Sequence, residues 1–141
     1  MTSLIELREM SDEQLEEKVE DAREELFNLR FQRASARLEN TARLPIVRHE
    51  LAQLLEILHK RQIAKSAAAK YAPIADFLSG KEWTATAHFS YEDNAWLVSF
   101  ADKKGINLAS ATVNLNKTMP KKQKRSGQAN TSLVTSYEIT R

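Results

Sequence analysis

The chain has 141 residues, no cysteine, and only three glycines and three prolines. This length allows one or two small domains, and the lack of cysteine excludes disulfide bonds and thiolate metal sites. No apolar run reaches the roughly 20 residues that a membrane-spanning helix requires. The N-terminus has neither a signal-peptide core nor the composition of a transit peptide, so we expect a cytoplasmic protein or one encoded in its own organelle.

The net charge of +2 conceals two blocks of opposite sign. Residues 6–25 carry ten acidic and three basic side chains, whereas residues 26–70 carry three acidic and nine basic ones. Such an asymmetry within one short segment indicates a polyanionic partner for the basic part.

The first expected helix begins at Asp12 and runs to about residue 35. Ser11 and Gln14 have the spacing of a capping box, in which each side chain accepts a hydrogen bond from the other residue's backbone N–H. Phe27 and Phe31 form an apolar row one helical turn apart. Beside them lies a longer apolar stripe with spacings of 4, 3, 4 and 3 residues: Leu15, Val19, Ala22, Leu26 and Leu29.

A second helix is expected after Asn40, which is a good N-cap residue. Its apolar stripe has matching spacings: Leu44, Val47, Leu51, Leu54 and Leu58. Proline is tolerated in a first turn but not in a helix interior, so Pro45 predicts a distorted first turn or a start near Leu44. The helical pattern weakens over residues 65–70, and residues 71–73 are typical of a linker or a frayed helix end.

The two stripes predict an antiparallel helical hairpin with a short connection. Two helices cover each stripe on one side only, and the row of Phe27 and Phe31 needs another surface to cover it. The hairpin is therefore expected to be a component of an assembly.

The residue pattern changes after residue 71, where alternating β-forming residues predict a small antiparallel sheet. The expected division is a helical hairpin over 1–70 and a β-rich extension over 71–141, which makes the chain α+β. The expected strands are 83–91, 95–100, 106–115 and 132–139, with turns at 92–94 and 102–105 and a basic loop at 117–127.

Several short pieces of the first seventy residues resemble one family, bacterial large-subunit ribosomal protein L twenty-nine. They occur in the family's order and without gaps: Glu6-Leu7-Arg8, Ser11-Asp12-Glu13-Gln14-Leu15, Glu24-Glu25-Leu26-Phe27-Asn28-Leu29-Arg30-Phe31-Gln32, Leu38-Glu39-Asn40 and Val47-Arg48-His49-Glu50-Leu51-Ala52. The chain departs from the family at Ala36, where glycine is common, which argues against a tight left-handed turn. It departs again at Pro45, where a basic residue is usual, which argues against one phosphate contact.

The resemblance implies a structural protein of the cytoplasmic ribosome that binds large-subunit ribosomal RNA near the peptide exit tunnel. It also implies ribosomal protein L twenty-three as a neighbour, with nascent chains or targeting factors within reach. The resemblance covers about half of the chain and gives no information on residues 71–141.

Five arginines cluster around the junction of the two expected helices: Arg30, Arg33, Arg37, Arg43 and Arg48. Their guanidinium groups suit the phosphates of a folded RNA, although they would also complement helix dipoles or pair with glutamates. Four polar residues beside them are candidates for hydrogen bonds to sugar and base edges: Gln32, Asn40, Thr41 and His49. Most of these contacts are expected to follow RNA shape rather than sequence.

The basic loop offers a second candidate RNA contact through five charges: Lys117, Lys121, Lys122, Lys124 and Arg125. Such a loop releases counterions when it meets RNA, and the alternative is a solvated loop. Trp83, Phe89, Tyr91, Trp96 and Phe100 suggest either a base-stacking platform or the core of a small sheet, and the strand spacing favours the core.

Enzyme chemistry finds no support in the sequence. His49, His59 and His88 are isolated, and there is no glycine-rich phosphate loop, metal-ligand spacing or nucleophile with a nearby base. We therefore expect a structural component of the large ribosomal subunit, with no cofactor, metal, small-molecule substrate or membrane partner. The alternative is a helical-hairpin interaction module whose β-rich half binds a non-ribosomal protein.

Overall fold

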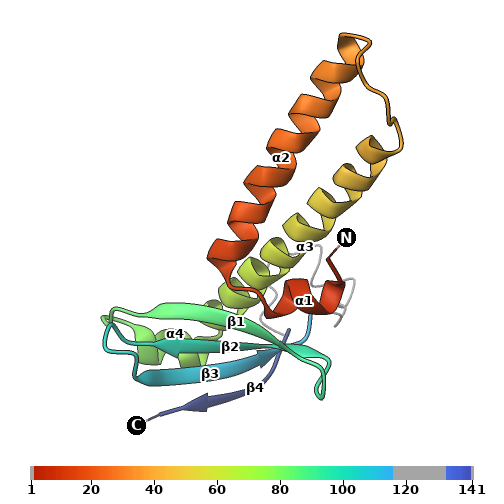
Figure 1. Ribbon diagram of the computed structural model, residues 1–141. Coiled ribbons are helices and arrows are strands. Elements are labelled where there is room, and N and C mark those ends of the chain that lie inside the picture. The colour runs from red at the N-terminus through yellow and green to blue at the C-terminus, as the bar shows by residue number, and fades with distance from the viewer. Residues whose placement is uncertain (1, 116–132, 141) are drawn as a thin grey trace, which may run out of the picture. The chain divides into compact units, whose positions relative to one another are not determined.

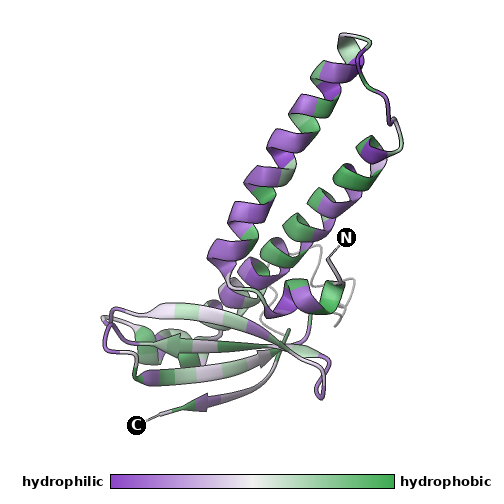
Figure 2. Cartoon of the chain, in the orientation of Figure 1, coloured by the Kyte–Doolittle hydropathy of each residue, from purple (hydrophilic) through white to green (hydrophobic). Residues whose placement is uncertain are grey.

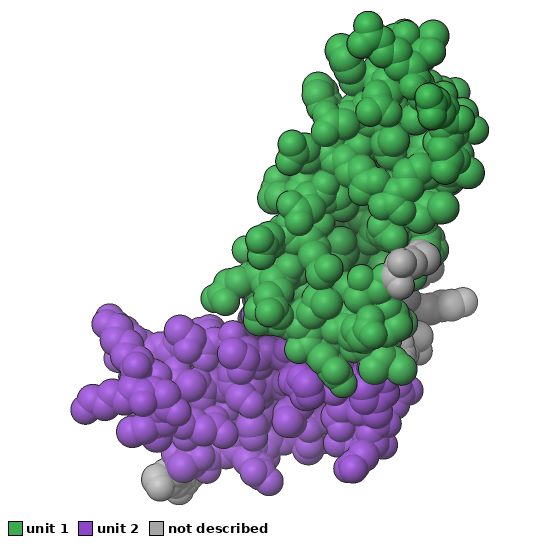
Figure 3. Space-filling model, in the orientation of Figure 1, with its two compact units in different colours: residues 1–59 green, residues 60–141 purple. Residues whose placement is uncertain are grey.

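The computed structural model describes residues 2–115 and 133–140 (Figure 1). They form two compact units, residues 1–59 and 60–141 (Figure 3), and the helix over residues 43–70 contributes residues to both. The elements are α1 (Leu4–Glu9), α2 (Asp12–Ala34), α3 (Arg43–Lys70), α4 (Ala72–Leu78), β1 (Thr84–Ser90), β2 (Ala95–Ala101), β3 (Asn107–Val113) and β4 (Val134–Ile139). The predicted α+β class, with a helical hairpin before an antiparallel sheet, is confirmed.

Helix α2 begins where its capping box predicts. The Ser11 hydroxyl accepts a hydrogen bond from the Gln14 N–H at 3.3 Å, and the Gln14 side chain accepts one from the Ser11 N–H at 3.1 Å. The buried residues of α2 are the five of the predicted stripe. Figure 2 shows α2 as a mostly hydrophilic helix interrupted by short hydrophobic segments.

Helix α1 was not predicted, because six residues are too few to show an apolar stripe. Its signal is a second capping box, in which Ser3 and Glu6 exchange side chain–backbone hydrogen bonds. Leu7 is its buried residue.

The end of α2 corrects the expectation at Ala36. This residue adopts φ +56°, the left-handed conformation that favours glycine. The Arg37 N–H donates to the Gln32 carbonyl at 2.8 Å and the Ala36 N–H donates to the Arg33 carbonyl at 3.2 Å. These two bonds form a Schellman motif, so the helix ends in a tight left-handed turn without a glycine.

Helix α3 begins at Arg43, so Pro45 lies in its first turn as predicted. Asn40 lies three residues before this start, and its Oδ1 accepts a hydrogen bond from the Ala42 N–H at 3.1 Å. Near this end of the hairpin, Leu26, Leu29 and Val47 form a buried cluster, and three partly buried leucines pack against it: Leu38, Leu44 and Leu51.

Residues 71–73 were expected to be a linker or frayed helix end, and this was wrong for Ala72 and Pro73, which begin helix α4. Tyr71 is the N-cap of α4, and Pro73 lies in the first turn, where its missing N–H costs no helical hydrogen bond. Ile74 and Leu78 of α4 are buried in the second unit.

The described strands form one antiparallel sheet in the order β1-β2-β3-β4. Its two faces differ in chemistry. Trp96, Val98 and Phe100 of β2 are buried, and their cross-strand partners on β3 are Val113, Ala111 and Ala109. The other face carries hydroxyl groups, with Thr86, Ser99 and Ser110 in register.

Of the five aromatic residues, Trp96 and Phe100 are buried in the core, as the strand spacing favoured, whereas Trp83 and Tyr91 are 39% and 52% exposed. Trp83 meets Phe100 edge to face at 5.1 Å between ring centroids, and Phe89 meets Trp96 at 5.3 Å and Tyr91 at 5.0 Å. These edge-to-face contacts join the exposed rings of Trp83 and Tyr91 to partners within the sheet.

Candidate nucleic-acid interface

Nine of the predicted site residues lie at one end of the hairpin. We define the hairpin tip as residues 29–49, which comprise the last turns of α2, the connection and the first two turns of α3 (Figure 1). The structure therefore brings together residues that are up to nineteen positions apart in sequence: Arg30, Gln32, Arg33, Arg37, Asn40, Thr41, Arg43, Arg48 and His49.

Four of the five arginines have guanidinium groups without a partner among residues 2–115 and 133–140. Arg30, Arg33, Arg37 and Arg48 are exposed, and in the described part of the chain their side chains have no recorded hydrogen bond or ion pair. Each presents a planar set of donors that fits a phosphate in a bidentate manner. The tip is thus a surface with four arginines whose charges are not paired with a carboxylate among the described residues.

Arg43 differs from the other four, because it holds α3 to α2. Its Nε donates to Glu25 Oε1 at 2.6 Å and its Nη2 donates to Glu25 Oε2 at 3.0 Å. Glu50 adds a weaker ion pair at 4.0 Å. The hydrogen bonds from Arg43 lower the pKa of Glu25, and Glu25 in turn raises the pKa of Arg43. Arg43 therefore has the alternative role expected for these arginines, which is pairing with a glutamate.

The polar residues of the tip are in different hydrogen-bonding states. Asn40 uses its side-chain oxygen within the connection, which leaves its amide NH₂ available. His49 Nε2 lies 3.2 Å from Gln53 Nε2 on the next turn of α3. Gln32 and Thr41 are exposed.

A surface hollow, which we call the tip hollow, lies between the end of α2 and the connection. The sequence did not predict it, because it depends on the fold of residues 35–40 back over α2. It combines apolar residues, two amides, two arginines and one carboxylate. Its lining residues are Leu29, Phe31, Gln32, Ser35, Arg37, Leu38, Glu39, Asn40 and Arg43.

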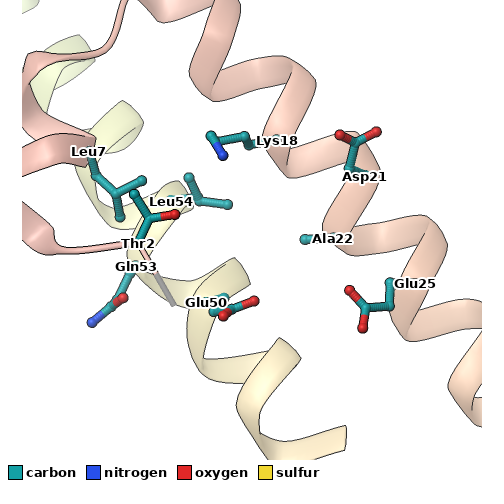
Figure 4. Close-up of a pocket in the computed structure, with 9 residues that line it drawn as sticks. All are labelled: Thr2, Leu7, Lys18, Asp21, Ala22, Glu25, Glu50, Gln53 and Leu54. Atoms are coloured by element: carbon teal, nitrogen blue, oxygen red, sulfur yellow. The ribbon is translucent and has the colours of Figure 1, made fainter. Parts of the chain in front are cut away.

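A second pocket of the same unit lies among α1, α2 and α3, nearer the other end of the hairpin (Figure 4). Three carboxylates line it, from Asp21, Glu25 and Glu50, against the single ammonium group of Lys18. This balance of charge disfavours a phosphate. The candidate interface is therefore confined to the tip within this unit.

The other predicted contact, the basic loop at 117–127, lies outside the described residues, so Lys117, Lys121, Lys122, Lys124 and Arg125 are not placed. In the described part of the chain, no cluster of His, Asp and Glu is arranged to hold a metal ion. No helix within residues 2–115 and 133–140 has the length and apolar character needed to cross a membrane.

Comparisons with known proteins agree with the resemblance noted in the sequence. The family described as Ribosomal L29 protein matches residues 5–61. The large ribosomal subunit protein uL29 of Mycolicibacterium vanbaalenii is 47% identical over 66 residues, which are 47% of this chain and 86% of that protein. The uL29 proteins of Nocardia farcinica and Mycobacterium leprae are 44% identical over 62 residues and 50% identical over 58 residues. These alignments cover 44% and 41% of this chain and 78% and 72% of the relatives.

Proposed function

The chain belongs to the ribosomal L29 protein family, known as uL29, and we propose that its hairpin tip binds large-subunit ribosomal RNA. Proteins of this family are structural components of the large ribosomal subunit, and the chain is accordingly a structural protein and not an enzyme. The proposed position is the one that the family resemblance implies, near the peptide exit tunnel of the cytoplasmic ribosome.

The free guanidinium groups of the tip are the observation that carries this proposal. Arg30, Arg33, Arg37 and Arg48 are exposed and have no recorded protein partner among the described residues. Arg43 shows what an arginine of this hairpin does when a carboxylate is within reach. Four such groups left free on one end of the protein suit a polyanion.

The acidic half of the hairpin supports the same orientation. Five glutamates precede the tip along α2: Glu13, Glu16, Glu17, Glu20 and Glu24. Their charge would repel a phosphate backbone, so RNA approaches the tip and the acidic part faces solvent or basic proteins.

A protein neighbour is proposed for the row of exposed rings on α2. Phe27 is 69% exposed and Phe31 is 65% exposed, which is unusual for large apolar side chains one turn apart. A neighbouring ribosomal protein that covers them would complete the hairpin. L twenty-three is the neighbour that the resemblance implies, and nascent chains or targeting factors lie within reach of the same region.

We propose residues 1–70 as the ribosomal hairpin and residues 71–141 as an extension that adds contacts to ribosomal RNA or ribosomal proteins. The charge of the segment 117–127 supports this role, because its five basic side chains would release counterions on RNA.

The test replaces Arg30, Arg33 and Arg48 together by glutamate in the full chain. The labelled protein is incubated with large subunits that lack it and is then sedimented through a sucrose gradient. We expect the wild-type chain to sediment with the subunits and the triple variant to remain at the top. Circular dichroism at the helical band verifies that the variant is folded, and unchanged co-sedimentation of a folded variant would refute RNA binding by the tip.

A further inference from the structure

The tip hollow has a composition that a phosphate site would not have. Glu39 lies in its lining beside Gln32 and Asn40, and in the described residues no ion pair or side-chain hydrogen bond is recorded for this carboxylate. A free carboxylate repels a phosphate and accepts hydrogen bonds only. We propose that the tip hollow receives one unstacked RNA base that carries an exocyclic amino group, an inference that rests on the proposed RNA-binding function.

The amide groups match the edge of such a base. Because Asn40 Oδ1 already accepts the Ala42 N–H, its NH₂ group is left to donate. The side chain of Gln32 offers both a donor and an acceptor. Together with Glu39 as an acceptor, the hollow presents donors to ring nitrogen or carbonyl groups and acceptors to an amino group. Adenine, cytosine and guanine display this combination on their edges.

The apolar residues give the hollow a surface for the flat face of a base. Leu29 belongs to the buried cluster of the hairpin, and Leu38 packs against that cluster. Both also line the hollow. Apolar side chains that are fixed by a core offer contact area without losing rotamer freedom on binding. Arg37, at the same hollow, is then available for the phosphate of the inserted nucleotide.

The backbone around the hollow is held in place before any ligand arrives. The Schellman motif fixes Ala36 and Arg37 on the end of α2, and the Asn40 side chain fixes the start of α3. A preformed hollow of this kind favours a base that is already out of a helix, such as one in a loop or bulge of the RNA.

The experiment uses chemical probing of large-subunit RNA with the full chain bound. Dimethyl sulfate reports the Watson–Crick edges of adenine and cytosine, kethoxal reports that of guanine, and hydroxyl radicals report the sugar–phosphate backbone. The variants are Gln32→Ala and Glu39→Ala, which remove the amide and the carboxylate and lie at exposed positions. Gln62→Ala, at an exposed position of α3 outside the tip, is the matched control for loss of an amide.

We expect one unpaired base to be protected by the wild-type chain and by Gln62→Ala, and to regain the reactivity of free RNA with Gln32→Ala or Glu39→Ala. The affinity should fall about tenfold in Gln32→Ala, while the backbone footprint keeps its position in both tip variants. A backbone footprint without a base whose protection depends on Gln32 and Glu39 would overturn this inference and leave the proposed function standing. Absence of any backbone footprint at the tip would overturn both.

Discussion

The two units of the chain differ in whether they bury aromatic side chains in a core of their own. In residues 1–59, Phe27 and Phe31 are 69% and 65% exposed, whereas in residues 60–141 Trp96 and Phe100 are 3% and 0% exposed. The sheet buries these two rings within its own unit, where helix α4 also contributes buried residues, while Trp83 and Tyr91 stay 39% and 52% exposed. The hairpin has only the seam between its helices to bury side chains. It follows that the extension is built around a core of its own, and the hairpin is built to be completed by a partner.

Spectroscopy can follow the two units separately. Every tryptophan and tyrosine of the chain lies in residues 71–141, and residues 1–59 contain no aromatic residue other than Phe27 and Phe31. Tryptophan fluorescence therefore reports the sheet, whereas circular dichroism at the helical band is dominated by α2 and α3. The fluorescence signal thus belongs to the second unit alone, whereas the helical signal comes mostly from α2 and α3 and includes the end of α3, which lies in the second unit.

The largest effect is expected for Phe100→Ala. The side chain is fully buried and packs against Trp83, so its loss should lower the free energy of unfolding of the sheet by about 3–5 kcal/mol. Denaturant titration followed by tryptophan fluorescence measures this change. The helical transition should move much less, and an equal shift of both transitions would show that the two units share one cooperative core.

The neighbours Leu26 and Phe27 give the sharpest contrast within the hairpin. Leu26 is 8% exposed and lies in the buried cluster, whereas Phe27 is 69% exposed. We expect Leu26→Ala to cost about 2–4 kcal/mol of hairpin stability and Phe27→Ala to change it by less than about 0.5 kcal/mol. Thermal unfolding followed by circular dichroism tests the pair. If Phe27→Ala were as damaging as Leu26→Ala, the row of rings would belong to the core of the free protein.

Ala36→Gly is expected to stabilise the hairpin. Ala36 adopts φ +56°, a conformation that is strained for a residue with a Cβ and free of strain for glycine. The gain should be about 1 kcal/mol, because part of the relieved strain is offset by the greater flexibility of glycine in the unfolded chain. The midpoint of hairpin unfolding should rise, and a fall would mean that the left-handed turn is absent in solution.

The smallest effect concerns the Glu25–Arg43 pair, whose side chains are 40% and 41% exposed and therefore screened by solvent. Hydrogen bonds from Arg43 hold the pKa of Glu25 below its usual value of 4.5. A carboxyl with a lowered pKa in the folded state stabilises the protein above its unfolded pKa, and this contribution is lost as the pH falls through the folded value. Glu25→Gln should therefore destabilise the hairpin slightly at neutral pH. The difference from wild type should vanish well below pH 4.5, and a difference that persists there would exclude the ion pair as its cause.

The sequence predicted the elements that have a clear period or a paired cap. The stripe of α2 and its capping box at Ser11 and Gln14 were found in this way, and so were the strands with alternating residues. Helices α1 and α4 were missed, because six and seven residues do not establish a helical period. The turn at Ala36 was missed for another reason: composition favours glycine there, and the hydrogen bonds of the Schellman motif override that preference.

The residues of the candidate site could be predicted from the sequence. Which of them pair with carboxylates and which line the tip hollow could not. The sequence gathers the arginines near one junction, but only the fold shows that Arg43 is held by Glu25 while Arg30 and Arg48 remain free. Glu39 and Leu38 had no predicted role in the site. They line the tip hollow together with Gln32 because the connection folds back over α2. No local sequence pattern predicts that fold.

RNA binding by the tip is tested most directly by comparing Arg23→Glu with Arg30→Glu in equilibrium binding of the full chain to large-subunit RNA at several salt concentrations. Both arginines are exposed on nearly the same side of α2, two turns apart, and both substitutions change the net charge equally. Arg23 pairs with Glu20 at 2.7 Å, outside the tip. We predict that Arg30→Glu weakens binding about tenfold and reduces the salt dependence by about one phosphate contact, while Arg23→Glu stays within about twofold of wild type. Equal losses for the two variants would contradict the account, because binding would then depend on overall charge and not on the tip.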